Sequence, residues 1–346
     1  MTAQQTLVIT TEAGQFPCAE GDTLLRAALR AGVGASYECN SGGCGTCKFT
    51  PRSGSFAQVQ EDPGGLTPRD RRRGRELACQ SVPLEDCDVE LTLDAAPSAA
   101  PAPATRAGTV VARRELTHDL TELTVTVDGP ADFLPGQFAM LRLIDGVAPG
   151  AVERLRSERA YSMSNLANDR GEWQFQVKEV PGGAVSRLLS KTVEVGTRVS
   201  VDGPYGHAYL KDTGRDVVCI AGGSGLAPMV SVARGLAARA DADDRSLHFF
   251  YGGRRVRDLC AGEFVEEVSG ALRATTLVEA LSDAEPDTWA GPTGFVHEAV
   301  QQASLVDLTD RDIYIAGPPV MTDAVVRLLM LELDVSADQV HYDRFF

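Results

Sequence analysis

The chain has 346 residues, enough for two or three domains that each bury a hydrophobic core. Its 48 acidic and 33 basic residues give a formal net charge of -15, which disfavours binding to nucleic acid and to anionic membrane surfaces. No apolar stretch is long enough to span a membrane, and the first ten residues lack the basic start of a signal peptide. We therefore expect a cytoplasmic protein that contacts neither nucleic acid nor a membrane.

An Ala/Pro-rich segment at residues 96–106 divides the chain, because its composition suits an extended linker. Residues 1–95 form the first predicted domain. Residues 107–211 contain short strands between Gly, Pro and Asp residues, which predicts an antiparallel barrel interrupted by one helix over 184–191. In residues 212–346 strands alternate with helices, which predicts a parallel sheet with helices on both faces.

The first domain begins with a predicted hairpin that leads into a helix. Residues 6–11 and 15–19 have strand character, and an amphipathic helix is expected over 23–31. Asp22 is the predicted N-cap and Gly32 the predicted stop signal.

Four cysteines have the spacing of a metal centre. Cys39, Cys44 and Cys47 follow a C-x4-C-x2-C pattern, and Cys79 stands alone further along the chain, which is the plant-type [2Fe-2S] arrangement. The glycines between them let backbone N-H groups approach the inorganic sulfides. A structural zinc site is the alternative, but zinc ribbons show two C-x2-C pairs and only one is present here. The other cysteines lack such spacing and are expected to be buried apolar residues: Cys18, Cys87, Cys219 and Cys260.

A basic run, Arg69–Arg75, follows the cysteine-rich loop. It has two interpretations: a solvated surface with ion pairs inside the domain, which we favour, or a docking site for an acidic partner.

Two segments of the predicted barrel suit a nucleotide cofactor. Arg159, Tyr161 and Ser162 lie on one strand and offer a cation, an aromatic ring and a hydroxyl group. The helix that begins near Gly183 presents backbone N-H groups and Ser186 to a pyrophosphate. Plain packing of the strand and helix explains these residues equally well.

Two glycine-proline turns follow apolar strands in the last predicted domain, and each precedes a helix. Such turns at the carboxyl ends of parallel strands can face one ligand crevice. The first departs from the G-x-G-x-x-G pattern because a proline occupies the final glycine position. The turns consist of Gly222, Gly223, Ser224, Gly225 and Pro228, and of Gly317, Pro318 and Pro319.

Together these motifs resemble the ferredoxin-NADP reductase superfamily, in the order found in reductase components of bacterial multicomponent oxygenases. The ending HYDRFF is similar to that of toluene, alkene and related diiron monooxygenase reductases. The resemblance implies a multidomain α+β and α/β protein. Its parts would be a β-grasp [2Fe-2S] ferredoxin domain, an antiparallel β-barrel FAD domain and a parallel-sheet α/β nicotinamide domain.

The resemblance also implies roles on the flavin side. Arg159 would contact the FAD diphosphate, Tyr161 would pack by the isoalloxazine or ribityl chain, and Ser162, the one catalytic residue we nominate, would hydrogen-bond near flavin N5. Phe345 or Phe346 would cover the flavin face where nicotinamide must enter. Further cofactor-binding positions are Val177, Lys178, Gly183, Ala184, Val185 and Ser186.

On the nicotinamide side, the two glycine-proline turns would be joined by residues at the end of the second strand. Asp258 would accept a ribose hydroxyl and favour NADH, whereas Arg254, Arg255 and Arg257 would equally suit a 2'-phosphate. The added positions are Tyr251, Gly252, Arg254 and Asp258.

Two features depart from the family pattern. Ala316 replaces the cysteine expected before the second turn, so hydride transfer is expected to be slower without being lost. Residues 147–158 are longer than expected and are interpreted as a surface loop.

The expected electron path runs from NADH to FAD to the [2Fe-2S] cluster, and then to the ferredoxin or diiron hydroxylase of a multicomponent monooxygenase. A flavin is needed because hydride carries two electrons and the cluster accepts one. One alternative is the reductase of a Rieske ring-hydroxylating dioxygenase, and the other is a non-enzymatic iron-sulfur redox sensor. The protein is expected to be a monomer.

Overall fold

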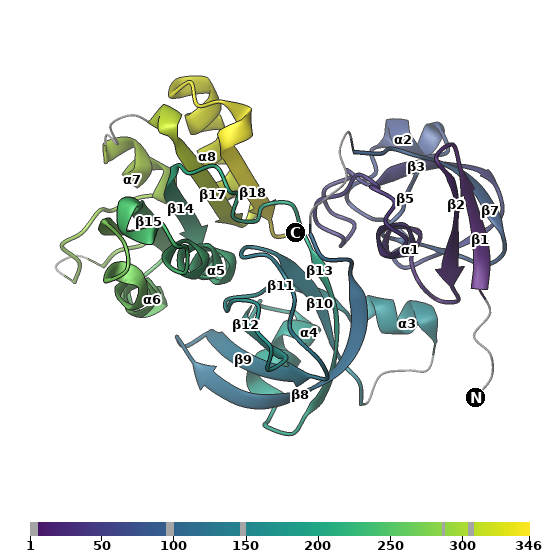
Figure 1. Ribbon diagram of the computed structural model, residues 1–346, viewed down its shortest axis with the longest axis horizontal. Helices are drawn as coiled ribbons and strands as arrows, with labels where there is room; N and C mark the ends of the chain where they lie inside the picture. The colour runs from purple at the N-terminus through teal and green to yellow at the C-terminus, as the bar shows by residue number, and fades with distance from the viewer. Residues whose placement is uncertain (1–5, 95–99, 146–149, 286–287, 304–307) are drawn as a thin grey trace.

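The computed structural model describes residues 6–94, 100–145, 150–285, 288–303 and 308–346. Figure 1 shows three units built on separate sheets, with the N-terminal unit at the right, the barrel at the bottom and the C-terminal unit at the left. Among the described residues, no helix is long and apolar enough to cross a membrane.

The N-terminal unit is a five-stranded sheet in the order β2-β1-β7-β3-β5, with α1 packed against it in the predicted β-grasp arrangement. A small second sheet pairs β4 with β6. The elements are β1 Thr6–Thr11, β2 Gly14–Ala19, α1 Leu24–Arg30, β3 Lys48–Ser53, β4 Phe56–Gln58, α2 Pro68–Arg72, β5 Glu76–Leu77, β6 Ser81–Pro83 and β7 Cys87–Leu91.

The predicted cap of α1 is wrong by one residue. Thr23 is the N-cap, because its backbone is extended and its hydroxyl accepts the N-H of Arg26 at 3.3 Å. The Asp22 carboxylate accepts the N-H of Thr23 and pairs with Arg30. The helix ends at Arg30, and Gly32 has the positive φ of 76° that its position as a stop signal requires.

The middle unit is a six-stranded antiparallel sheet in the order β11-β10-β13-β8-β9-β12. A bridge between Met163, next to β11, and Phe175 in β12 joins the two outer strands and closes the predicted barrel. Inward-facing side chains such as Trp173 fill its core. The strands are β8 Ala104–Glu115, β9 Leu120–Val127, β10 Phe138–Leu143, β11 Arg159–Ser162, β12 Glu172–Lys178 and β13 Arg198–Tyr205.

Two segments of the barrel differ from prediction. The helix expected over 184–191 begins as α4, Ala184–Arg187, and continues as a π-helical turn at Leu188–Thr192. The expected surface loop at 147–158 is partly helical, because α3 spans Ala151–Arg156 and rests on the N-terminal unit; its positions 147–149 lie outside the described residues.

The C-terminal unit is a parallel sheet in the order β16-β15-β14-β17-β18. Successive residues of β14 enter two different hydrophobic clusters, one under α5 and α6 and the other under α7 and α8, so helices cover both faces as predicted. The elements are β14 Asp216–Gly222, α5 Leu226–Ala237, β15 Ser246–Gly253, α6 Ala261–Ser269, β16 Ala274–Leu281, α7 Val296–Gln302, β17 Arg311–Gly317, α8 Pro319–Arg327, a π-helical turn Leu328–Glu332 and β18 Val340–Arg344. Short 3-10 turns lie at Gly223–Gly225, Ala242–Asp244, Val256–Asp258, Leu308–Asp310 and Ala337–Gln339.

A buried charge network joins the N-terminal unit to the barrel. The Arg26 guanidinium lies 2.7 Å from the Glu158 carboxylate and 3.0 Å from that of Asp202. Arg30 approaches Asp202 to 2.6 Å, and Arg142 approaches Glu158 to 3.3 Å. Because every charge in this network has an opposite partner, the interface holds charged groups away from water without leaving one isolated.

Candidate electron-transfer site

The four predicted cysteine ligands converge. The Sγ atoms of Cys39 and Cys44 are 3.3 Å apart, and those of Cys47 and Cys79 are also 3.3 Å apart. Cys44 is partly exposed and the other three are buried. These contacts are too long for disulfide bonds, and two close thiol pairs, one for each iron, form the donor set that a [2Fe-2S] cluster takes.

Backbone N-H groups already point at these sulfur atoms. The N-H groups of Ser41 and Cys44 lie 3.4 Å from Cys39 Sγ, and that of Thr46 lies 3.4 Å from Cys44 Sγ. The hydrogen bond with Cys44, helped by these donors and opposed by burial, lowers the pKa of Cys39 to about 6. Such donors stabilise thiolate, which is the form that binds iron, so the loop fits a [2Fe-2S] cluster.

The remaining cysteines lie apart from this group. Cys18 and Cys87 belong to the core of the N-terminal unit, and Cys219 lies in the core of the C-terminal sheet. Cys260 packs against that same C-terminal core. Cys18, Cys87 and Cys219 are buried as predicted, whereas Cys260, the residue before α6, is only partly buried.

A cavity of about 550 Å³ lies where the three units meet. Cys79 and Gln80 line it from the cluster side, Arg159 from the barrel, and Phe346 from the C-terminus. Within the described residues, the side-chain nitrogen and oxygen of Asn40 and the side-chain oxygen of Gln80 are buried without a hydrogen-bond partner. Unsatisfied polar groups beside a cavity of this size fit a large ligand with its own donors and acceptors.

The three residues of the predicted flavin strand have different surroundings. Arg159 lines the cavity, and its guanidinium donates to the backbone carbonyl oxygens of Arg156 and Glu158 at 2.8 and 2.6 Å. Tyr161 packs against the barrel core, and burial raises its pKa. Ser162 is buried at the end of β11, opposite Phe138 of β10.

The predicted pyrophosphate segment forms a tight turn into α4. The Ser186 hydroxyl accepts the N-H of Val180 and donates to the Gly183 carbonyl oxygen, both at 3.2 Å. No side chain caps the N-terminus of α4, so the N-H groups of Ala184 and Val185 are left for another acceptor. Val177 is fully buried and offers only its backbone to a ligand.

The two glycine-proline turns share a second cavity of about 350 Å³ with an apolar lining. The turns approach each other so closely that a Cβ atom on Gly225 would lie 1.9 Å from the carbonyl oxygen of Ala316. The expectation that both turns face one crevice is therefore met. The predicted residues that line the cavity are Lys178, Gly222, Gly223, Tyr251, Gly252, Arg254, Asp258 and Pro318. Five predicted positions lie outside the lining: Ser224, Gly225, Pro228, Gly317 and Pro319.

Sequence reasoning missed five apolar residues at this cavity: Phe295, Val296, Val320, Met321 and Ala324. Phe295 is the N-cap residue of α7, a helix that the sequence pattern did not reveal. The signal available in the sequence was adjacency, since Val320 and Met321 directly follow Pro319 of the second turn. In the structure Phe295 and Val320 are 63% and 80% exposed.

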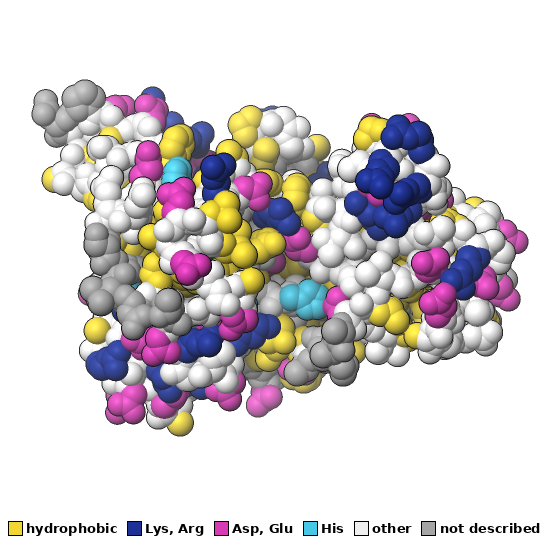
Figure 2. All heavy atoms as spheres, turned by 90° about the horizontal axis from the view of Figure 1, so that it is seen from above, with side chains coloured by type: hydrophobic (Ala, Val, Ile, Leu, Met, Phe, Trp, Pro, Cys, Tyr) yellow, Lys and Arg dark blue, Asp and Glu magenta, His cyan; other side chains and the backbone are white. Residues whose placement is uncertain are grey.

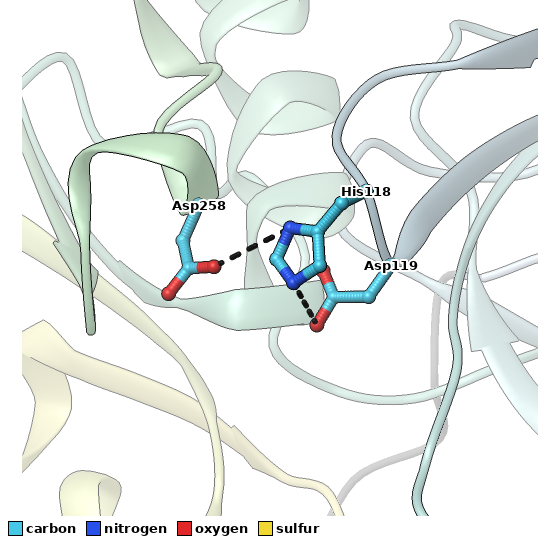
Figure 3. A group of neighbouring side chains, drawn as sticks. All are labelled: His118, Asp119 and Asp258. Carbon is cyan, nitrogen blue, oxygen red and sulfur yellow. Dashed lines mark ion pairs between the residues drawn. The ribbon is translucent and has the colours of Figure 1, made fainter.

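Asp258 lies in a group of three side chains contributed by two units (Figure 3). One of its carboxylate oxygens accepts the N-H groups of Arg254 and Arg255 at 3.0 and 3.1 Å, and the other faces His118 Nδ1 at 3.7 Å. His118 Nε2 lies 3.7 Å from Asp119, whose carboxylate pairs with a lysine of the barrel. Asp258 therefore orders the turn beside the cavity, and its predicted ribose contact stays a prediction.

The arginines considered for a 2'-phosphate differ in their existing ion pairs. Arg254 lies 3.4 Å from Asp119, and Arg255 lies 2.8 Å from Asp283. Arg257 has no carboxylate partner among the described residues. Two of the three guanidinium groups thus already form ion pairs with carboxylates of this chain.

The C-terminus connects the second glycine-proline turn to the cysteine loop. The N-H of Phe345 donates to the Gly317 carbonyl oxygen at 3.0 Å. Arg344 makes two hydrogen bonds of 2.9 Å to the Glu38 carboxylate, next to Cys39 in the chain. A Cβ atom on Gly43 would lie 2.3 Å from the Phe346 ring, so the terminal aromatic side chain covers the cysteine loop.

Comparison with known proteins agrees with this geometry. Three family models match in series: the 2Fe-2S iron-sulfur cluster binding domain at residues 9–84, the oxidoreductase FAD-binding domain at 107–209 and the oxidoreductase NAD-binding domain at 219–327. The chain is 40% identical to the ferredoxin-NAD(P)(+) reductase CarAd of Metapseudomonas resinovorans, over 96% of this chain and 98% of that protein.

Two further relatives cover nearly the whole chain. The ferredoxin-NAD(+) reductase component of the alkene monooxygenase system of Xanthobacter autotrophicus is 37% identical, over 95% of this chain and 97% of that protein. The solved structure of the ferredoxin reductase in carbazole 1,9a-dioxygenase aligns with a TM-score of 0.87 and 34% identity, covering 100% of both chains. The chain belongs to the ferredoxin-NAD(P)(+) reductase family, oxidoreductases in which a [2Fe-2S] domain precedes FAD-binding and NAD-binding domains.

Proposed function

We propose that this enzyme oxidises NADH and delivers the electrons, through FAD and the [2Fe-2S] cluster, to the ferredoxin or diiron hydroxylase of a multicomponent monooxygenase. The observation that carries the proposal is the cavity of about 550 Å³, since Cys79, Arg159 and Phe346 line it from three different units. A flavin held there would lie beside a cluster ligand on one side and the C-terminus of the nucleotide unit on the other. Membership in a family of oxidoreductases sets aside the alternative of a non-enzymatic sensor.

We assign the binding roles by position within proposed domains 1–95, 107–211 and 212–346, joined by the linker 96–106. When bound, FAD accepts an electron pair as hydride and releases single electrons to the cluster. The four cysteines hold the iron, and the N-H groups around Cys39 stabilise its negative charge.

The residues around FAD bind and orient it. Arg159 neutralises the diphosphate, and the uncapped first turn of α4, with Gly183 and Ser186, holds its oxygens. Ser162, at the end of β11, would hydrogen-bond to the flavin ring when FAD is bound, because no hydrogen bond of its hydroxyl occurs within the described residues. Excluding water and fixing the approach of nicotinamide are the main tasks of these side chains.

We assign NADH as the reductant. Arg254 and Arg255 already pair with carboxylates, which leaves less positive charge for a 2'-phosphate. The alkene monooxygenase relative, whose name specifies NAD(+), supports the same choice.

A second candidate places this reductase with a ring-hydroxylating dioxygenase. It is favoured by the close structural match to the ferredoxin reductase in carbazole 1,9a-dioxygenase. Reconstitution with a purified diiron hydroxylase system and, separately, with a Rieske dioxygenase system discriminates the two. Faster electron delivery to the dioxygenase system would overturn the monooxygenase assignment.

An anaerobic titration with NADH, repeated with NADPH, tests the electron path. We expect the flavin and cluster absorption bands to bleach together at low NADH, and only at much higher NADPH. A cluster that stays oxidised while the flavin bleaches would refute the proposed path.

A further inference from the structure

The basic run of the N-terminal unit forms one exposed patch. Residues 1–96 contain nine Lys or Arg against thirteen Asp or Glu, and five of those nine basic residues fall within 69–75. Figure 2 shows a continuous group of Lys and Arg side chains on this unit, on the side where α2 lies in Figure 1. A concentrated positive surface therefore occurs on a unit whose net charge is negative.

Three arginines of this patch lack a carboxylate partner. Arg69, Arg72 and Arg73 are exposed, and their positions i, i+3 and i+4 place them on one face of the helical turn. We call these three residues the arginine face. Within the described residues no ion pair involves any of them, whereas Arg71 and Arg75 pair with Asp62 and Asp70. The other basic residues of the unit are all paired with carboxylates: Arg26, Arg30, Lys48 and Arg52.

The helix that carries the arginine face and the segment that leads into it contact the cysteine loop and the strand that follows it. Lys48 follows Cys47, and its ammonium group lies 3.0 Å from Asp70 in α2. The segment that leads into α2 also touches the loop, because the N-H of Gly65 donates to the Gly42 carbonyl oxygen at 2.9 Å.

The cluster ligands have different exposures on the two sides. Cys79 is 3% exposed and lines the flavin cavity, whereas Cys44 is partly exposed and is followed, after one glycine, by the exposed Thr46. That glycine, Gly45, packs against the backbone of Gly65. The exposed edge of the loop thus abuts the segment that carries the arginine face.

We propose that the arginine face is the docking surface for an acidic protein electron acceptor, a small ferredoxin whose negative surface contacts these guanidinium groups. The assignment rests on the proposed function, because it requires a reduced cluster that gives one electron to the acceptor. Like charges at these spacings disfavour the helix, and an incoming carboxylate surface relieves their repulsion. Charge complementarity also steers the acceptor toward the cluster edge before contact.

The test compares two double variants with equal charge change. Arg69→Glu/Arg72→Glu reverses the arginine face, and Arg198→Glu/Arg327→Glu makes the same change on exposed arginines of the other two units. The acceptors are a small [2Fe-2S] ferredoxin of strongly negative charge and cytochrome c, a strongly basic protein. We expect the first variant to reduce the ferredoxin about tenfold more slowly at low salt and cytochrome c faster, with both differences vanishing at high salt.

The control variant should change either rate less than about twofold, because its substitutions lie away from the exit edge. Equal effects in both variants, or no effect in the first, would overturn the docking proposal. Anaerobic bleaching of flavin and cluster by NADH is measured on the same samples. If NADH fails to bleach the wild type, the proposed function is wrong. If bleaching is normal but the two double variants reduce the acceptors at the same rates, only the docking proposal is wrong. Binding of a DNA duplex through the same arginines, with no effect on ferredoxin reduction, would also overturn the proposal.

Discussion

Removing the charge of Asp202 should loosen the contact between the ferredoxin domain and the barrel. Its side chain is 3% exposed, and its two oxygens lie 3.0 Å from Arg26 and 2.6 Å from Arg30. Asp202→Asn leaves both guanidinium groups in the interface with less negative charge. Loss of one partner in a buried pair costs about 3 to 5 kcal/mol.

The expected cost lies at the lower end of that range. Arg26 keeps Glu158 at 2.7 Å, and Arg30 keeps Asp22, so neither cation is left without a partner. About 3 kcal/mol corresponds to a roughly 100-fold larger population of the separated domains.

Hydrogen exchange at one amide reports this separation. The N-H of Gly206, in the barrel, donates to the Tyr37 hydroxyl of the ferredoxin domain at 2.9 Å. Its exchange should accelerate roughly 100-fold in Asp202→Asn, while the amides of β9 in the same barrel keep their rates.

A matched control separates domain docking from general destabilisation. Asp312 is also buried and pairs with Arg215 at 3.4 Å, but both lie in the nucleotide domain. Asp312→Asn should leave exchange at Gly206 unchanged. If Asp202→Asn leaves it unchanged too, or accelerates the β9 amides equally, the network does not hold the domains together.

Three further predictions follow from the site and its surroundings. Cys79→Ser should abolish the cluster absorption and reduce the iron content, while NADH still bleaches the flavin. The control Cys219→Ser replaces a buried thiol far from the cluster loop, so it should preserve the cluster absorption and the iron content. Gly225→Ala should lower kcat/KM for NADH about 100-fold, because its Cβ would lie 1.9 Å from a carbonyl oxygen of the facing turn. The control Gly262→Ala places its Cβ more than 4 Å from any other atom, so it should leave kcat/KM unchanged. Burial raises the pKa of Asp202, but two arginines outweigh this effect and hold the pKa below its normal value. The Asp202 carboxylate therefore contributes its full stabilisation of the domain contact above about pH 4, and this contribution is lost as the pH falls through the folded-state pKa. X-ray scattering should therefore detect acid-induced expansion that is absent from Asp202→Asn.

The cysteine ligands and the barrel strands were predictable because their signals are local. Cys39, Cys44 and Cys47 lie within nine residues, and their spacing alone restricts the chemistry. Strands such as β9 and β12 alternate apolar and polar residues with the period of two that a barrel wall requires. Each signal lies within the segment that forms the element.

The domain contacts were not predictable because their partners are far apart in the chain. Arg26 and Asp202 are separated by 176 positions, and nothing near either residue identifies the other. The segment 147–158 was predicted to be a loop because a six-residue helix is too short to show a reliable hydrophobic periodicity in the sequence. Its stability comes from the ferredoxin domain, where Arg156 donates to the Val59 carbonyl oxygen at 2.6 Å. Strand β18 was missed for a related reason, since its polar residues become a strand only by pairing with β17.

These long-range contacts bear on how electrons would leave the protein. The charge network and α3 both hold the ferredoxin domain against the barrel, so the proposed transfer from flavin to cluster needs no domain rotation. Under the two proposals, the cavity of about 550 Å³ and the arginine face would lie at different edges of the cluster, marked by Cys79 and by Cys44. An acceptor could then dock at the second edge while FAD occupied the first. Under this arrangement the rate of delivery is set by encounter with the acceptor, and it should rise in proportion to acceptor concentration and fall with added salt.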